Sequence, residues 1–302
     1  MKDEFIFYPP IRWGLIVHAA GALLLAGAGG YGLWQAFHAL IGPIFLIYLI
    51  PSFLALGLAV WLVYRAYALR GAFYTLERDG LKLHWGLRLE DIPMDTVVWA
   101  RPADDLEAKL PLPWQRIPGS ILGSRNLPGV GTVEFMASSW HGIVLVATQE
   151  RIYAISPRDP GAFLSTFQRY MELGSLSPLP ARSIFPTILL ARVWEARPAR
   201  YMILLGLVFS LLLLVGVSLA VPGRDQVSLG FTPALTPHDP VPAVRLMLLP
   251  VLNGFFFLAD LLLGLFFFRQ DEGQSLAYLV WGGGALTSLL FLLGMVFVLQ
   301  IG

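Results

Sequence analysis

The chain has 302 residues, of which 56% are hydrophobic and 14% are charged, and its formal net charge is +1. Soluble domains usually carry about 25% charged residues. Together with a mean hydropathy of +0.67, the composition indicates a protein embedded in a membrane for much of its length. The small net charge argues against nucleic-acid binding, which needs a concentrated basic surface. Because there is no cysteine, disulfides, thiolate metal sites and thiol nucleophiles are excluded.

Five stretches are apolar enough, and long enough at about 20 residues, to span a hydrocarbon core as helices. A polar insert between the second and third stretches holds most of the charge, and the first two stretches form a hairpin. The start of the chain is a poor signal-peptide n-region, because it carries as many acidic as basic residues, so the first span is expected to be retained. The spans run from about Trp13 to Ala36, Ile44 to Tyr64, Tyr201 to Val221, Leu246 to Phe268 and Leu276 to Leu299.

The basic residues near the span ends predict the orientation. Cytoplasmic flanks are enriched in Lys and Arg. With the N-terminus inside, eight basic residues lie on inside flanks and only Arg224 and Arg245 on outside flanks. The insert is therefore expected to face the cytoplasm, and the C-terminus to lie on the outer side of the membrane. The eight are Lys2, Arg12, Arg65, Arg70, Arg192, Arg197, Arg200 and Arg269.

Within the insert, the sequence changes from long apolar blocks to alternating apolar and polar residues. FYTLER, DG and LKLHWG predict a β-hairpin, and LRLEDI, GTVEFMA, GIVLVAT and RIYAIS predict further strands, with a short strand possible near SIL. The segment 101–131 is rich in proline and glycine and is expected to be a long loop. Asp159 then offers an N-cap, with Pro160 at the first helical position and Gly174 as a stop. About six or seven strands followed by one helix predict a β-barrel or sandwich closed by that helix.

Four stretches of the insert are similar to a known family. YTLERDGLKLHWG, IPMDTVV, LGSRNLPGVGTVEF and RIYAISPRDPGAFLSTF resemble the bacterial pleckstrin-homology-like domains that are attached to membrane helices. The resemblance covers about residues 72–174. It implies a bent antiparallel barrel with a C-terminal helix, and a binding or scaffolding role rather than catalysis.

The first hairpin decides whether phosphoinositide binding follows from the resemblance. Eukaryotic relatives that bind these lipids use a basic cluster there. Here acidic residues interrupt the basic ones, so we expect a solvated strand face and do not infer phosphoinositide binding. The basic residues are Arg78, Lys82 and Arg88, and the acidic ones are Glu77, Asp79, Glu90 and Asp91.

The fold class expected from these patterns is an α-helical membrane bundle with an inserted antiparallel β-barrel or sandwich domain. Residues 1–70 form the N-terminal segment and first hairpin, and 71–175 form the cytoplasmic domain. Residues 176–200 form a basic amphipathic linker, and 201–302 hold the last three spans with an outer loop at 222–244.

Three groups of residues are candidate sites. Exposed tryptophan and arginine suit binding hot spots, which favours a partner-binding surface made of Trp114, Arg116, Arg125, Trp140 and His141. Arginines before the third span suit anionic headgroups, although they are equally consistent with an ordinary inside flank; they are Arg182, Arg192, Arg197 and Arg200. Ionisable and polar residues within spans are costly and are functional candidates; they are Asp260, His18, Asn253 and Ser210.

We hypothesise that Asp260 faces the bundle interior and pairs with His18 or Ser210; a hydrogen-bonded clamp between helices is the alternative to a proton or ion path. The sequence lacks HExxH, GxSxG and phosphate-loop motifs, and only one intramembrane aspartate is present where an aspartyl protease needs two. We therefore expect no catalysis, metal or cofactor.

The expected role is docking of a protein partner or lipid headgroup by the cytoplasmic domain, as a scaffold of a membrane or envelope complex. A transporter or channel component that uses Asp260, His18 and Asn253 is the alternative, and a subunit with glycine-rich helix faces buried against partners is a third.

Overall fold

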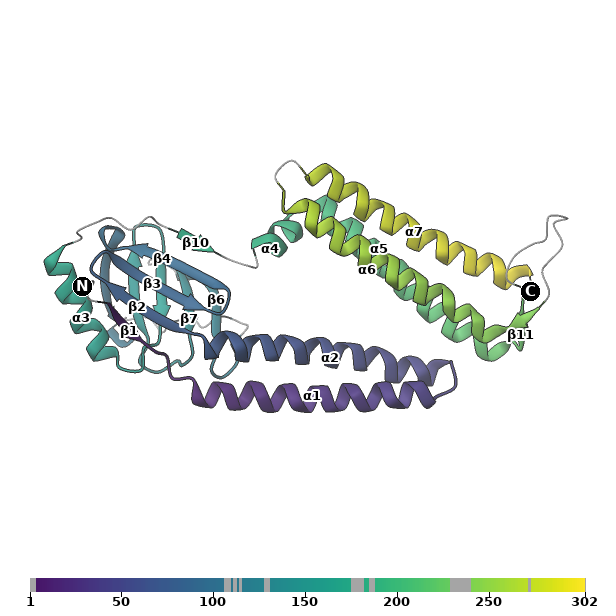
Figure 1. Cartoon of the computed structure of the whole chain (residues 1–302), viewed down its shortest axis with the longest axis horizontal. Helices are drawn as coiled ribbons and strands as arrows, with labels where there is room; N and C mark the ends of the chain where they lie inside the picture. The colour runs from purple at the N-terminus through teal and green to yellow at the C-terminus, as the bar shows by residue number, and fades with distance from the viewer. Residues whose placement is uncertain are drawn as a thin grey trace. The chain divides into compact units, whose positions relative to one another are not determined.

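The computed structural model describes residues 4–105, 110, 113, 116–127, 131–174, 182–184, 188–228, 240–270 and 273–301. The chain divides into two compact units. The first contains Met1–Gly27 and Ala55–Pro186, and the second contains Ala28–Leu54 and Thr187–Gly302. Figure 1 labels the elements of both units.

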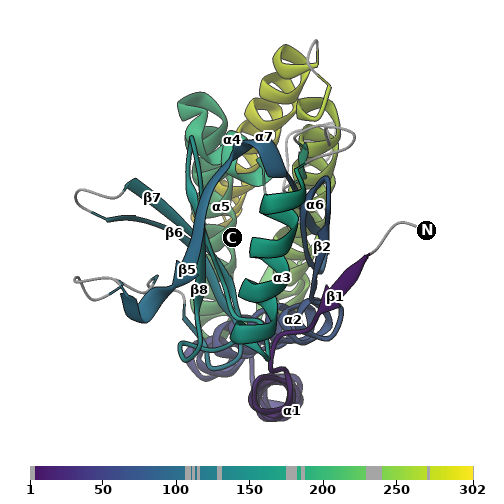
Figure 2. The same cartoon turned by 90° about the vertical axis from the view of Figure 1, so that its left-hand side faces the viewer.

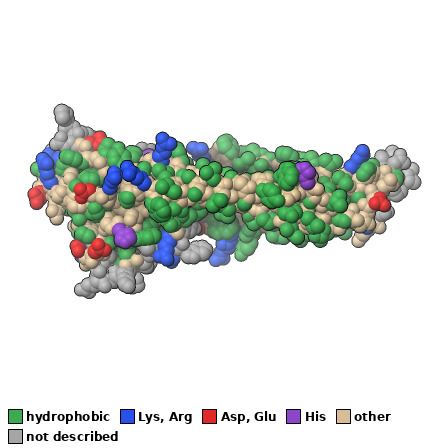
Figure 3. All heavy atoms as spheres, turned by 90° about the horizontal axis from the view of Figure 1, so that it is seen from below, with side chains coloured by type: hydrophobic (Ala, Val, Ile, Leu, Met, Phe, Trp, Pro, Cys, Tyr) green, Lys and Arg blue, Asp and Glu red, His purple; other side chains and the backbone are tan. Residues whose placement is uncertain are grey.

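Within the described residues, five helices are long and apolar enough to cross a membrane, and each coincides with a predicted span. Helix α2 continues well past the predicted end at Tyr64 and leads directly into the sheet domain. Hydrophobic side chains cover most of the helical surface seen in Figure 3. The helices are α1 (Arg12–His38), α2 (Pro43–Arg70), α5 (Arg197–Ala220), α6 (Leu248–Phe268) and α7 (Gln274–Ile301).

Two five-stranded sheets form the sheet domain in the described part of the chain, and all of their strands except β1, which precedes α1, lie between α2 and α5. The first has the order β1-β2-β3-β4-β10, with β1 (Phe5–Phe7), β2 (Phe73–Glu77), β3 (Gly80–Trp85), β4 (Arg88–Pro93) and β10 (Arg182–Ile184). The second has the order β5-β8-β9-β7-β6, with β5 (Val97–Pro102), β8 (Val144–Thr148), β9 (Ile152–Ile155), β7 (Gly131–Ala137) and β6 (Ile121–Leu127).

The helix that follows the strands is α3 (Pro160–Leu173), as predicted. The Asp159 carboxylate accepts a hydrogen bond from the Ala162 amide at 2.9 Å, which caps its N-terminus. Gly174 ends it with φ at +67°. Phe163 and Phe167 are buried in a core that both sheets share. Figure 2 shows α3 lying along the opening between the two sheets.

The sheets match the sandwich and not the closed barrel of the two predicted alternatives, and one strand pair is not antiparallel as predicted. No backbone ladder joins the two sheets in the described part of the chain, so they form an open sandwich. Strands β7 and β9 pair in parallel, with Val133 opposite Ile152. The parallel pair arises because the chain passes from β7 to β8 across one strand position, and β9 then returns into the gap between them.

Strands β1, β5 and β10 were not expected from the pattern. Two of them have only three residues and cover the edges of the first sheet, where β1 pairs with β2 and β10 pairs with β4. By pairing with β2 and β4, they cover strand edges whose unpaired backbone groups could otherwise pair with another chain and cause aggregation. The third, β5, ends in Arg101 and Pro102 within the segment read as loop.

Helices α1 and α2 are fixed to the sheet domain at two close contacts. A β-carbon on Gly14 would lie 2.6 Å from the Cα of Gly119, so the first turn of α1 meets the 117–120 turn backbone to backbone. A β-carbon on Gly86 would lie 2.6 Å from the Ala68 side chain of α2. Gly86 and Gly119 both have positive φ, at +62° and +86°, so both positions require glycine for conformation as well as space.

The second unit contains a bundle of α5, α6 and α7. Helix α4 (Ile188–Glu195) precedes it. Short strands β11 (Gln226–Val227) and β12 (Val241–Pro242) pair between α5 and α6. One apolar core of this unit contains Leu213, Val217 and Leu246.

Candidate functional site

A pocket of about 220 Å³ lies where α1 meets the sheet domain. We call it the interfacial pocket. Three segments form it: the start of α1, the turn after the long loop, and the connection between β7 and β8. Its lining residues are Pro10, Trp13, Gly14, Pro118, Gly119, Ser138, Ser139, Trp140 and His141.

The β7–β8 connection is held by hydrogen bonds to one serine. The Ser156 hydroxyl, which is fully buried, accepts from the backbone amides of Ser138 at 2.8 Å and Ser139 at 3.4 Å. The Ser139 hydroxyl in turn accepts from the His141 amide at 3.1 Å. These bonds satisfy backbone donors within the loop and fix the direction in which Trp140 leaves it.

Two tryptophans of the pocket are unusually exposed for their size. Trp13 is 70% exposed and Trp140 is 52% exposed. The Trp140 and His141 rings lie 5.9 Å apart. Trp13 follows Arg12 in the first turn of a helix long enough to cross a membrane, which is the position at which tryptophan is enriched at membrane–water interfaces. The pocket thus offers indole and imidazole groups at the end of a helix long and apolar enough to cross a membrane.

The predicted partner-binding residues are not all in this pocket. Trp140 and His141 line it. Arg116 and Arg125 are exposed but do not line it, and Trp114 lies outside the described residues. Trp13 was not predicted to line a pocket, although its place next to Arg12 at the start of a span was the available signal.

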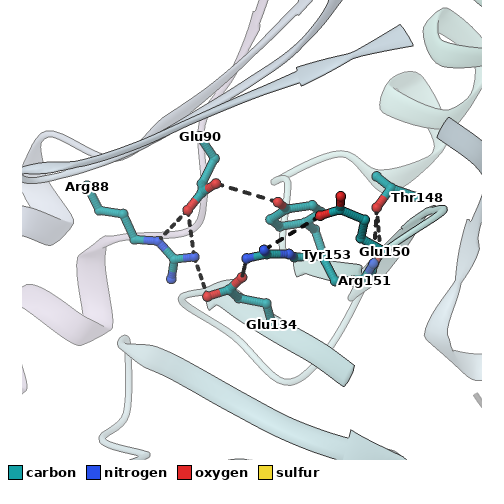
Figure 4. Close-up of polar contacts among 7 residues, drawn as sticks. All are labelled: Arg88, Glu90, Glu134, Thr148, Glu150, Arg151 and Tyr153. Carbon is teal, nitrogen blue, oxygen red and sulfur yellow. Dashed lines mark hydrogen bonds and ion pairs between the residues drawn. The ribbon is translucent and has the colours of Figure 1, made fainter. Parts of the chain in front are cut away.

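A second polar feature, which we call the charged cluster, joins the two sheets (Figure 4). Arg88 of β4 pairs with Glu90 of β4 at 3.0 Å and with Glu134 of β7 at 2.5 Å. Arg151 reaches Glu134 at 3.2 Å, and the Tyr153 hydroxyl donates to Glu90 at 3.5 Å. Burial, and then the negative charge of Glu90, raise the pKa of Tyr153.

The charged cluster corrects one expectation. Arg88 and Glu90 were expected on a solvated strand face, but the Glu90 side chain is 2% exposed and that of Arg88 is 12% exposed. They are buried because Glu134 and Tyr153 from the opposite sheet face them, which the local sequence could not reveal. Lys82 is 37% exposed, as expected of a solvated face, but its partner Glu77 has a side chain only 9% exposed, so Glu77 too is more buried than expected.

A pocket of about 210 Å³ opens beside the charged cluster, lined in part by Asp91, Thr148 and Glu150. Arg151 and Tyr153 also border it. Arg151 pairs with Glu134 and Glu150, so the pocket belongs to the charged cluster.

The predicted headgroup arginines lie on three different elements. Arg182 is in β10, Arg192 is exposed on α4, and Arg197 and Arg200 are in the first turn of α5. The described part of the predicted basic amphipathic linker therefore contains a strand, a short helix and the start of a span. Lipid contact by these arginines stays a prediction.

The predicted intramembrane residues fall in both units. Asn253 donates to the Ser210 hydroxyl at 2.8 Å, and that hydroxyl donates to the Gly206 carbonyl and lies 3.3 Å from the Ser288 hydroxyl. These bonds tie α6, α5 and α7 together. Asp260 lies against α7, since a β-carbon on Gly284 would be 2.7 Å from its carboxylate oxygen.

His18 is fully buried in α1 of the first unit, and its Nδ1 lies 2.7 Å from the Gly14 carbonyl. Because a carbonyl oxygen only accepts, Nδ1 carries the proton in this bond. Pairing of His18 with Asp260 stays a prediction. The Ser210 hydroxyl bonds with Asn253 and Gly206 in the described structure.

Comparison with known proteins identifies one segment of the chain. No curated protein and no solved structure matches the chain. Residues 72–170 match the family model described as "Bacterial PH domain". This segment holds β2 to β9 and nearly all of α3, and the matched range agrees with the resemblance read from its motifs. The chain therefore contains a bacterial PH domain between its second and third long apolar helices.

Proposed function

We propose that the protein is a non-enzymatic docking protein of the bacterial inner membrane, whose PH domain and first helix together bind an anionic phospholipid headgroup at the cytoplasmic face. The observation that carries the proposal is the interfacial pocket, because Trp13 belongs to a membrane helix and Trp140 to the PH domain. A ligand in this pocket touches both parts.

The chemistry of the pocket suits a phosphate-bearing headgroup. Indole and hydroxyl groups of its lining donate hydrogen bonds, and Arg12, which is exposed beside Trp13 but does not line the pocket, adds positive charge nearby. Tryptophan places an apolar ring toward hydrocarbon and an N–H toward water. The eight-to-two excess of basic residues on one set of flanks supports the cytoplasmic orientation.

Headgroup binding is tested with dihexanoyl phosphatidylglycerol, which is soluble and has short chains. The full chain in detergent is titrated while tryptophan fluorescence is followed. We expect saturable binding that Trp140→Ala weakens about tenfold or more, since aromatic anchors of such sites contribute 2 kcal/mol or more. Trp34→Ala is the matched control, because Trp34 is 54% exposed on the same helix but does not line the pocket. Equal binding by wild type and Trp140→Ala would refute the proposal.

The orientation has an independent test that uses the absence of cysteine. Single cysteines at exposed Arg125 in the PH domain and at exposed Gln226 of β11, in the connection between α5 and α6, are treated with a membrane-impermeant maleimide in spheroplasts. Labelling at position 226 alone is expected. Labelling at position 125 before lysis would place the PH domain outside.

A further inference from the structure

Asp260 is an acidic residue near the middle of α6, a helix long and apolar enough to cross a membrane. At 1.5 Å per residue, it lies about 18 Å from Leu248 and about 12 Å from Phe268, the two ends of the helix. Its side chain is partly exposed and makes no hydrogen bond or ion pair with another described residue. An ionisable group in hydrocarbon is costly unless it is paired, so an unpaired one marks a functional position.

The α7 surface beside Asp260 consists of small residues. A β-carbon on Gly284 would lie 2.7 Å from the Asp260 carboxylate, so this side chain rests directly on the α7 backbone. Gly283 is exposed, and no atom lies within 4 Å of a β-carbon built on it. Thr287 and Gly294 follow Gly283 after four and eleven residues, spacings that keep all three on one side of the helix. Thr287 is also three residues after Gly284, so this open side borders the carboxylate.

Two exposed apolar side chains of α6 flank Asp260 on its outer side. Phe256 precedes it by four residues and Leu263 follows it by three, and these side chains are 51% and 49% exposed. The Phe256 ring also lies 6.3 Å from the Phe291 ring of α7. We call this surface of the bundle the Asp260 face; it consists of Phe256, Asp260, Leu263, Gly283, Thr287 and Gly294.

The polar groups inside the bundle do not engage Asp260. The Ser210 hydroxyl, a partner predicted from the sequence, accepts from Asn253 and donates to the Gly206 carbonyl. His18, the other predicted partner, has a fully buried ring in α1, and its Nδ1 bonds a carbonyl of its own helix. A group that pairs with the Asp260 carboxylate can therefore approach from the exposed side of the bundle.

The depth and the charge of this face select its occupant. Within hydrocarbon, the groups that can cover it are lipid chains and helices. A lipid chain carries no cation or donor about 12 Å from the span end. A second copy offers no accessible cation either, because His18 and Arg65, the basic residues more than one turn inside its described spans, are both buried. A foreign helix with a lysine or arginine supplies the charge, and the glycines allow its backbone to approach closely.

We propose that the Asp260 face binds a transmembrane helix of a partner protein, and that a lysine or arginine side chain of this helix pairs with the Asp260 carboxylate. This interaction goes beyond headgroup binding by the interfacial pocket. It uses residues of the second unit, whereas Trp13 and Trp140 belong to the first, so neither interaction depends on the other.

A designed helix tests the proposed pairing. The probe is a synthetic leucine–alanine transmembrane helix with one lysine at its centre, and the control helix has leucine at that position. Binding to the full chain in mixed micelles is followed by energy transfer from the tryptophans of the protein to a dansyl group on the helix. The lysine helix should bind about tenfold more tightly, toward the upper end of what one interhelical polar contact contributes.

Three variants of the full chain locate the binding site. Asp260→Asn removes the charge but keeps the shape of the side chain, so the preference for lysine should disappear. Gly283→Leu covers the open side of α7 and should weaken binding of the lysine helix about tenfold or more. Gly254→Leu is the matched control, because Gly254 is equally exposed and open but lies six residues before Asp260, on another side of α6.

Equal affinity for the two helices, a lysine preference that persists in Asp260→Asn, or equal effects of Gly283→Leu and Gly254→Leu would overturn the inference. A wild-type dimer that Asp260→Asn dissociates would overturn it in favour of a second copy. Proton flux in proteoliposomes that Asp260→Asn abolishes would overturn it in favour of an ion path. Headgroup binding is decided separately by Trp140→Ala.

Discussion

In the PH domain, Glu90 and Glu134 are buried as ions that share Arg88 and Arg151 across two sheets. In the α5–α7 bundle, the fully buried polar side chains of the described residues are neutral, as with Asn253 and Ser288. The two regions therefore accommodate buried polar side chains in different ways. The domain brings opposite charges together from strands distant in sequence, whereas helices in hydrocarbon use amides and hydroxyls, whose desolvation costs less.

Replacing Arg88, the cation that Glu90 and Glu134 share, should lower the stability of the domain more than any other change considered. Arg88→Met leaves two buried carboxylates with reduced compensation, and loss of one partner of a buried pair costs about 3–5 kcal/mol. Guanidinium unfolding of the full chain in detergent, followed by tryptophan fluorescence, measures the free energy of unfolding. Arg125→Met is the control, because Arg125 is an exposed residue of the same domain, and should change stability by less than about 0.5 kcal/mol.

A triple variant tests the same cluster in the opposite direction, by removing all of its buried charges together. Replacing Arg88, Glu90 and Glu134 by Met, Leu and Leu removes all three charges of the buried core of the cluster. Stability should recover to near the wild-type value, because apolar replacement of a whole buried ion group is often neutral or stabilising. If Arg88→Met alone leaves stability unchanged, the cluster does not hold the sheets together.

Features that depend on residues close together in the chain, such as helix ends and apolar spans, could be predicted from the sequence. The Asp159 cap and the Gly174 stop of α3 lie within a few residues of the helix they bound, and the spans follow from apolar runs of sufficient length. The charged cluster and the interfacial pocket depend instead on contacts between distant segments, such as Arg88 with Glu134 and Gly14 with Gly119. Neither residue of such a pair carries a local signal of its partner.

Tyrosine burial gives the next largest effect, at high pH. Burial raises the pKa values of Tyr74 and Tyr153 above the ordinary value of 10.0. Each raised pKa contributes stability that is complete below pH ~10 and is lost as pH rises through the folded-state pKa, because the unfolded tyrosine then ionises first. The free energy of unfolding should fall by up to about 1.4 kcal/mol per pH unit for each tyrosine above pH ~10.

Unfolding midpoints measured from pH 8 to pH 11 check this slope. Tyr153→Phe removes one titrating group and should flatten the decline, while exposed Tyr8 replaced by Phe should not. An unchanged slope in Tyr153→Phe would mean that Tyr153 ionises as readily in the folded protein as in the unfolded one.

The smallest change in stability is expected in the α5–α7 bundle. Asn253→Leu removes the hydrogen bond to Ser210 that links α6 to α5, and such interhelical bonds contribute about 0.6 kcal/mol on average and at most about 1.7. The Leu side chain also removes Asn253 Oδ1, which is buried without a partner in the described structure, so part of the loss is offset. We therefore expect a loss below about 1 kcal/mol in SDS-induced unfolding in mixed micelles, with exposed Leu252→Ala as a control on the same helix. A loss of 3 kcal/mol or more, as large as that in Arg88→Met, would show that the bundle depends on its neutral polar contacts as strongly as the domain depends on its charges.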